Sequence, residues 1–88
     1  MSNQTVAEVL ASADDSVTLI NDINTNGSDS EYVAEDSTQD EINDMVQRNV
    51  DHLEIILAYT DPDVAGSSED KSSYTDAIAT GNAYIAAN

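Results

Sequence analysis

The chain has 88 residues, which is enough for one small domain, and a formal net charge of −16, because eighteen acidic residues stand against Arg48 and Lys71 alone. Two cationic side chains cannot build a patch for phosphate groups, so this composition argues against nucleic-acid binding. The absence of cysteine excludes disulfides and thiol chemistry, and no stretch approaches the roughly eighteen apolar residues expected of a membrane span.

The first predicted element is a helix over residues 5–23. Residues 1–9, which include the start of this helix, lack the basic residues and the long apolar run of a secretory signal. Thr5 and Glu8 have the T-x-x-E spacing of a capping box. Apolar residues then recur at helical spacing, namely Val6, Val9, Leu10, Ala13, Val17 and Ile20. Residues 14–16 (DDS) interrupt the pattern, so two alternatives stay open: one continuous helix, or a break followed by a second short helix capped by Asp15 or Ser16.

Residues 24–36 are rich in Asn, Gly, Ser and Asp, which predicts a loop. The stretch 22–27 (DINTNG) matches D-x-N-x-N-G, the first half of a calcium loop of the EF-hand type. Its candidate ligands are Asp22, Asn24, Asn26 and Glu31. The second half departs from the pattern, because Val33 stands where a bidentate Glu belongs. Asn-Gly turns also form without a metal, so a plain turn is the main interpretation and a calcium site is the alternative. Residues 61–66 (DPDVAG) are a weaker echo of the same pattern.

The central segment, residues 38–60, predicts the clearest helix in the chain. Thr38 and Glu41 form a second capping box, and Asp40 adds negative charge at the positive end of the helix dipole. Seven apolar residues follow at spacings of three and four: Ile42, Met45, Val46, Val50, Leu53, Ile56 and Leu57. Asp44 and Arg48 form an i,i+4 acid–base pair, and Pro62 ends the helical pattern.

After a second polar loop at 61–71, residues 73–87 predict a last helix, with Ser72 or Ser73 as its cap. Its apolar stripe consists of Tyr74, Ala77, Ile78, Gly81, Tyr84 and Ile85. Gly81 costs about 1 kcal/mol in a helix interior, which is easier to tolerate if another backbone comes close there. The three helices predict a single all-α domain over 1–88, an antiparallel three-helix unit with two polar loops.

Residue types that carry catalysis are scarce in this chain. His52 is the only histidine, and with no second histidine or cysteine it has no partners for a metal site. The sequence contains no nucleophile elbow, phosphate loop or dinucleotide fingerprint. We therefore expect no enzyme and no cofactor, with His52 in a structural or interface role.

The predicted core is marginal for so high a charge. Leu, Ile and Val number eighteen and Phe is absent, while self-repulsion among the acids opposes the compact state. This electrostatic destabilisation would be relieved by screening with salt or divalent cations, by homo-oligomerisation, or by docking on a larger protein. The expected interface residues are Ile55, which lies off the central stripe, and the stripe residues Tyr74, Ile78, Gly81, Tyr84 and Ile85 of the last helix, because tyrosines and small residues suit close contacts.

Two segments, 46–58 (VQRNVDHLEIILA) and 74–85 (YTDAIATGNAYI), give the chain a family resemblance. Over this C-terminal half it resembles small acidic virion accessory proteins of tailed bacteriophages. The resemblance implies a head decoration (cement) protein, or a neck or tail component. The implied partner is a larger structural protein such as the major capsid protein. The implied location is the virion, with the host cytoplasm during assembly. It transfers no functional residue, since it contains no motif with a known role.

The leading hypothesis is therefore a non-enzymatic structural protein that docks on a larger assembly. One alternative is an acidic DNA mimic that inhibits a nucleic-acid enzyme, which would need carboxylates laid along a continuous face. Another is a small calcium-binding module at Asp22–Glu31. A saline habitat would equally account for the acidity, since it too depletes Lys and enriches Asp.

Overall fold

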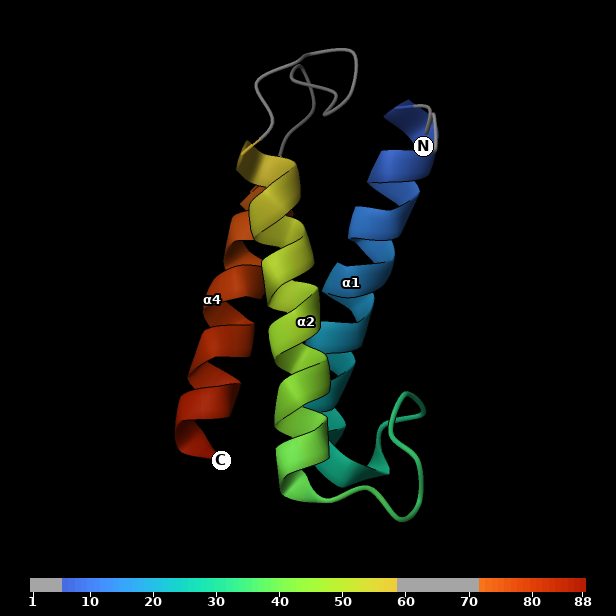
Figure 1. Cartoon of the computed structure of the whole chain (residues 1–88), viewed down its shortest axis with the longest axis vertical. Coiled ribbons are helices and arrows are strands. Elements are labelled where there is room, and N and C mark those ends of the chain that lie inside the picture. The colour runs from blue at the N-terminus through green and yellow to red at the C-terminus, as the bar shows by residue number, and fades with distance from the viewer. Residues whose placement is uncertain (1–5, 59–71) are drawn as a thin grey trace.

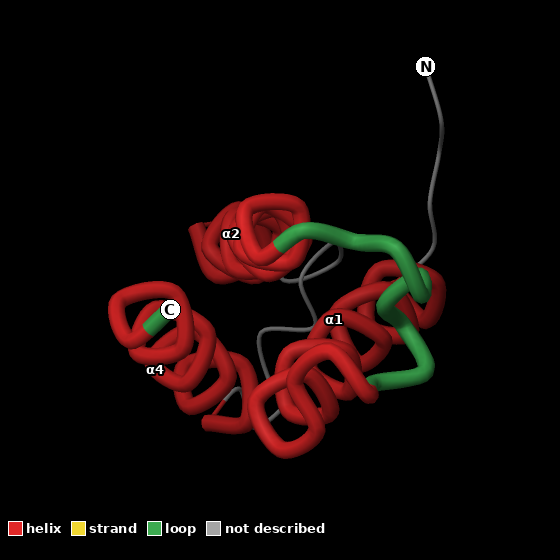
Figure 2. Tube along the Cα trace, turned by 90° about the horizontal axis from the view of Figure 1, so that it is seen from below, coloured by secondary structure: helices red, strands yellow, loops and turns green. Residues whose placement is uncertain are grey.

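The computed structural model describes residues 6–58 and 72–88, with side chains from Glu8 onward. Helix α1 (Val6–Asn26) leads through a short 3-10 turn, η1 (Gly27–Asp29), and a loop to α2 (Gln39–Ala58), and the last helix is α4 (Ser72–Ala87). Neighbours α1 and α2, and α2 and α4, run in opposite directions (Figure 1). All three pack on one another around a common axis (Figure 2). The predicted all-α three-helix fold is confirmed, and the described residues contain no strand.

Helix α1 is continuous, so the alternative with a break near Asp14 is wrong. Asp14 and Asp15 are exposed on it, whereas Ser16 is buried. The Ser16 hydroxyl donates a hydrogen bond to Asn49 Oδ1 on α2, at 2.8 Å. The interruption in the apolar pattern is therefore an inward-facing polar contact between two helices.

The end of α1 also differs from the prediction. The helix continues to Asn26 and not to residue 23, so residues 24–26 belong to the helix and not to the loop. Gly27 then takes a φ of +57°, a left-handed conformation that is costly for residues with a Cβ. The chain turns through η1, closed by the Ser30 N–H donating to the Gly27 carbonyl at 3.0 Å.

The start of α2 confirms the second capping box. The Thr38 N–H donates to Glu41 Oε1 at 2.8 Å, and the Glu41 N–H donates to Thr38 Oγ1 at 3.2 Å. These two bonds satisfy backbone donors that the first turn of a helix otherwise leaves without partners. Thr5, the cap predicted for the first helix, lies outside the described residues, as do 59–60 and the whole second loop with its 61–66 motif.

The core is formed by the predicted stripes of all three helices. Its buried apolar members are Val9, Ala13, Ile20, Ile23, Ile42, Val46, Val50, Leu53, Ile56, Tyr74, Ala77 and Tyr84. Gly81 lies among them and packs against α2: a Cβ at Gly81 would lie 2.5 Å from Val50 Cγ2. The helix contact at this glycine is close, as expected, but the atoms nearest to position 81 belong to the side chains of Val50, Val46 and Ile20 and not to another backbone.

Candidate functional site

The calcium candidates do not adopt the conformation that a calcium loop requires. Asp22, Asn24 and Asn26 lie within α1, where successive side chains fan around the helix axis and do not converge on one point. Asp22 is engaged by its own neighbours: Oδ1 accepts from Asn26 Nδ2 at 3.0 Å, and Oδ2 accepts from the Ser30 hydroxyl. Glu31 is exposed in the loop. Residues 6–58 and 72–88 contain no cluster of three or more His, Asp or Glu side chains placed to hold a metal ion. The motif acts as a helix terminus, with Asp22 as its acceptor.

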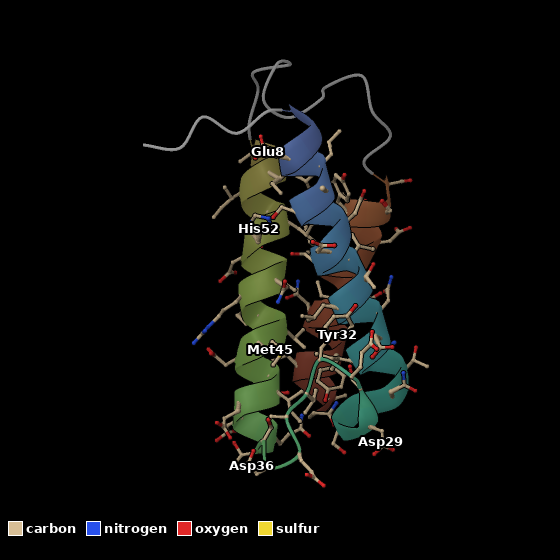
Figure 3. All side chains as sticks on the ribbon, turned by 90° about the vertical axis from the view of Figure 1, so that its right-hand side faces the viewer. Glu8, Asp29, Tyr32, Asp36, Met45 and His52 are labelled. Carbon is tan, nitrogen blue, oxygen red and sulfur yellow. The ribbon has the colours of Figure 1, made fainter. Side chains whose placement is uncertain are left out.

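Ser30 extends this arrangement into the loop. Its side chain is buried, and its hydroxyl oxygen accepts from the Tyr32 N–H at 3.2 Å. Tyr32 lies on the side of the molecule shown in Figure 3, as does Met45 of α2. Partial burial and then the nearby carboxylates of Glu31, Asp22 and Asp15 raise the pKa of the Tyr32 phenol. A phenol at its ordinary pKa of 10.0 is already protonated at neutral pH, so the raised pKa leaves Tyr32 a neutral polar group there.

His52 takes part in a set of polar contacts along the α1–α2 boundary. Its Nε2 lies 2.8 Å from the Ser12 hydroxyl, one turn of α1 before the Ser16–Asn49 bond. The Asn49 amide also donates to the Met45 carbonyl at 2.8 Å. In the part of the chain with described side chains, no buried polar side-chain atom lacks a hydrogen-bond partner. These contacts fix the register of α1 on α2, and they explain the position of His52 without a chemical role.

A shallow hollow of about 320 Å³ lies near the start of α2. Its lining is Ser37, Glu41, Asp44, Met45 and Arg48. Arg48 and Asp44 form the predicted ion pair there, at 2.7 Å, with side chains that are 79% and 58% exposed. Such exposed pairs contribute little to stability, because solvent screens them. The hollow contains no histidine, and its two carboxylates are engaged within the chain, Glu41 by the Thr38 N–H and Asp44 by Arg48.

Three of the six expected interface residues belong to the core. Tyr74, Gly81 and Tyr84 are buried within the three-helix unit. The tyrosine hydroxyls reach the rim: that of Tyr74 donates to Asp14 Oδ1 at 3.3 Å, and that of Tyr84 accepts from Gln39 Nε2 at 2.9 Å. Side chains that pack the core offer little area to a partner while the fold is intact, so packing inside the chain accounts for these three residues.

The other three expected interface residues remain accessible, but on two different surfaces. Ile55 is 57% exposed, the only large apolar side chain so exposed among those described. It follows Arg48 by seven residues and Asp51 by four, so it lies on a charged outer face of α2. Ile78 and Ile85 are half-buried and pack against the core from α4.

Half-buried aliphatic side chains line the boundary between α1 and α4. On α1, Ser12 and Ser16 face α2. Leu10 and Val17 lie on the side of the buried α1 stripe that is turned away from these serines. On α4, Tyr84 and Gly81 face α2, and Ile78 and Ile85 flank their stripe on its other side. Since α1 and α4 pack on each other, these four flanking residues form one seam. We refer to Leu10, Val17, Ile78 and Ile85 as the α1–α4 seam.

The outer face of α4 adjoins this seam and carries almost no charge. Its exposed residues are Thr75, Asp76, Ala79, Asn82, Ala83 and Ala86. Asp76 is the sole charged side chain from Ser72 to Asn88, whereas carboxylates recur along α1, the first loop and α2. The charge of the molecule is therefore distributed unevenly between α4 and the other two helices. The small residues of this helix can be identified from the sequence. The seam cannot, because it exists only once α1 and α4 are packed.

Among the described residues, no helix has both the length and the hydrophobicity needed to cross a bilayer. Comparison of the chain with known protein families, curated proteins and solved structures finds no match. The resemblance to phage virion proteins stays a prediction.

Proposed function

We propose that the chain is a non-enzymatic structural protein that docks on a larger assembly, as a decoration or cement protein of a bacteriophage head. The observation that carries the proposal is the low charge of α4 in a molecule whose net charge is −16. Burying a charged side chain in an interface carries a desolvation cost that an uncharged face avoids. A partner would therefore cover the outer face of α4 and the α1–α4 seam, with the acidic faces of α1 and α2 left in solvent.

The apolar content of this surface suits contact with a protein. The seam supplies four aliphatic side chains that are only half-buried, and the alanines of α4 allow another backbone or sheet to approach closely. Fully buried interface centres are depleted of charge and rich in apolar area, with charged groups at the rim. Asp76 and Asp14 would lie at that rim, where basic residues of a capsid subunit could pair with them.

The test is co-sedimentation of the purified chain with head particles of the phage that encodes it. Ala83→Glu places a carboxylate in the middle of the α4 outer face, and Gln47→Glu, on the exposed face of α2, is the matched control with the same added charge. We expect Ala83→Glu to weaken binding by tenfold or more, because one buried unpaired charge costs about 1.4 kcal/mol or more in affinity. Gln47→Glu should bind like the unmodified chain.

Two results would contradict the proposal. Equal binding by both variants would show that the α4 face is not the contact surface. Failure of the unmodified chain to bind heads, together with recovery of a restriction or repair enzyme in a pull-down, would replace docking with DNA mimicry. Circular dichroism of each variant establishes that the helices are intact before binding is compared.

A further inference from the structure

We infer that Asn26–Gly27 is a self-modification site, at which the asparagine converts to aspartate and isoaspartate, and that Asp22 controls its rate. Two observations point to this site. Asn26 is exposed and is followed by glycine, the residue that obstructs its own backbone nitrogen least. Its side-chain amide is held by one contact, the 3.0 Å hydrogen bond to Asp22 Oδ1.

The reaction needs only the chain and water. The backbone nitrogen of Gly27 attacks Cγ of Asn26, a new N–Cγ bond forms, and the Cγ–Nδ2 bond breaks. Ammonia leaves with the proton from the Gly27 N–H, which closes a succinimide ring. Water then adds to either ring carbonyl and opens the ring, giving aspartate or isoaspartate at this position. No oxidation or reduction takes place.

The fold favours a glycine after Asn26. Gly27 has a φ of +57°, where a residue with a Cβ is strained. A Cβ built at Gly27 meets no atom within 4 Å, so the left-handed backbone, and not crowding, disfavours other residues at this position. The turn that follows α1 therefore accounts for the glycine of the Asn-Gly pair.

The folded structure also restrains the reaction. The backbone of Asn26 is helical, with φ −108° and ψ −14°, and its amide points back along α1 to Asp22. Attack by Gly27 requires the side chain to turn away from Asp22 and the last turn of α1 to open. Helix ends open locally far more often than whole domains unfold, so the rate follows the opening of this turn.

The products weaken the structure that formed them. An aspartate at this position places a second carboxylate where the amide donated to Asp22, and it adds negative charge at the negative end of the α1 dipole. An isoaspartate adds a methylene group to the backbone and cannot continue the helix. Either product removes the hydrogen bond that Asp22 accepts from the Asn26 amide. It thereby makes the Asp22 side chain, which also accepts a hydrogen bond from Ser30 at the start of the loop, less constrained.

The experiment follows each asparagine of the intact chain by peptide mapping and mass spectrometry during incubation at mildly alkaline pH. Asp22→Ala removes the restraint, and Glu54→Ala removes one exposed carboxylate from α2 as a charge-matched control. In buffer we expect Asn26 to react at least about threefold to tenfold faster in Asp22→Ala than in the control or the unmodified chain, because the variant loses the hydrogen bond that holds the Asn26 amide and also the bond from Ser30. In urea, where the fold is absent, all three rates should converge and Asn26 should react fastest of the asparagines. Asn26→Gln should lack the modification.

Either of two outcomes would overturn the inference. If Asn26 reacts no faster than Asn43 in urea, the Asn-Gly pair is not intrinsically more reactive than the other asparagines. If Asp22→Ala and Glu54→Ala react alike in buffer while both remain helical, Asp22 does not restrain it. A direct product mimic, Asn26→Asp, tests the structural consequence: we expect a lower Tm than for Asn43→Asp, which adds the same charge to an asparagine within α2.

Discussion

Gly81 of α4 lies directly against Val50 of α2. A Cβ at position 81 would lie 2.5 Å from Val50 Cγ2 and 3.2 Å from Val46 Cγ1, both on stiff β-branched side chains. The missing side chain is what lets the two helices approach at this point. The glycine therefore serves packing, although it costs helix propensity.

We predict that Gly81→Ala destabilises the fold. Forcing a methyl group into a filled core costs about 1–3 kcal/mol, which exceeds or offsets the roughly 1 kcal/mol gained in helix propensity. Thermal unfolding should show a Tm lower by several degrees, since about 1 kcal/mol corresponds to roughly 4–8 °C in a domain of this size. In a Val50→Ala background the same substitution should cost less, because space has been made. A higher Tm for Gly81→Ala alone would show that α4 is free to move away from α2.

The capping box at the start of α2 makes a second prediction, on pH. Hydrogen bonds from the Thr38 backbone and then from its side chain lower the pKa of Glu41 below its ordinary value of 4.5. A depressed folded-state pKa means that the carboxylate stabilises the fold above the unfolded pKa, and that this contribution is lost as pH falls through the folded pKa. The Tm difference between the unmodified chain and Glu41→Gln should therefore be positive at neutral pH and vanish in acid.

The comparison has to be a difference, because acid also neutralises the other carboxylates and relieves their repulsion. Asp40→Asn removes a charge from the same first turn and serves as the control. If the two variants have the same pH profile, the effect belongs to the helix dipole and not to the capping box.

Periodicity predicts most of this fold, and the places where it fails have physical reasons. The α2 stripe and the Thr38–Glu41 box are local patterns, set within one or two helical turns, and both are confirmed. The continuity of α1 through residues 14–16 was left open because the partner of Ser16 is Asn49, 33 residues away. The extension to Asn26 depends on Asp22 accepting from both Asn26 and Ser30. Composition favours a loop there, and only the folded contacts favour the helix.

The burial of Tyr74 and Tyr84 also could not be predicted from periodicity. Tyr74 and Tyr84 share a helical face with Ile78 and Ile85, and spacing alone does not separate core from surface within so broad a stripe. Their hydroxyls find Asp14 and Gln39 at the rim, so the rings can be buried at little cost. The low charge of α4 can be read from the sequence, but the seam beside it cannot.

A third prediction concerns calcium. Since Asp22 lies in a helix and both of its carboxylate oxygens already accept hydrogen bonds, we expect no saturable binding in an isothermal titration with millimolar calcium. Asp22→Ala should give the same trace as the unmodified chain. A saturable heat that disappears in Asp22→Ala would show that α1 unwinds from Asp22 onward to form a metal loop, and it would restore the calcium module as a function.

The fourth prediction is that salt stabilises the isolated chain strongly. With a net charge of −16, carboxylates on α1, the first loop and α2 repel one another, and the Debye length falls from about 30 Å at 0.01 M to about 3 Å at 1 M salt. The Tm should rise steeply with NaCl, and at low salt the chain should be partly unfolded or should melt in a concentration-dependent way. Replacing exposed Glu35 and Glu54 by Lys should raise the low-salt Tm and flatten the salt dependence, whereas replacing them by Asp keeps the charge and should leave the salt dependence unchanged. A cooperative melt at low salt that is independent of protein concentration and of NaCl would show that the three-helix core outweighs the repulsion unaided. Such a melt would also remove the marginal stability that motivates a docking partner.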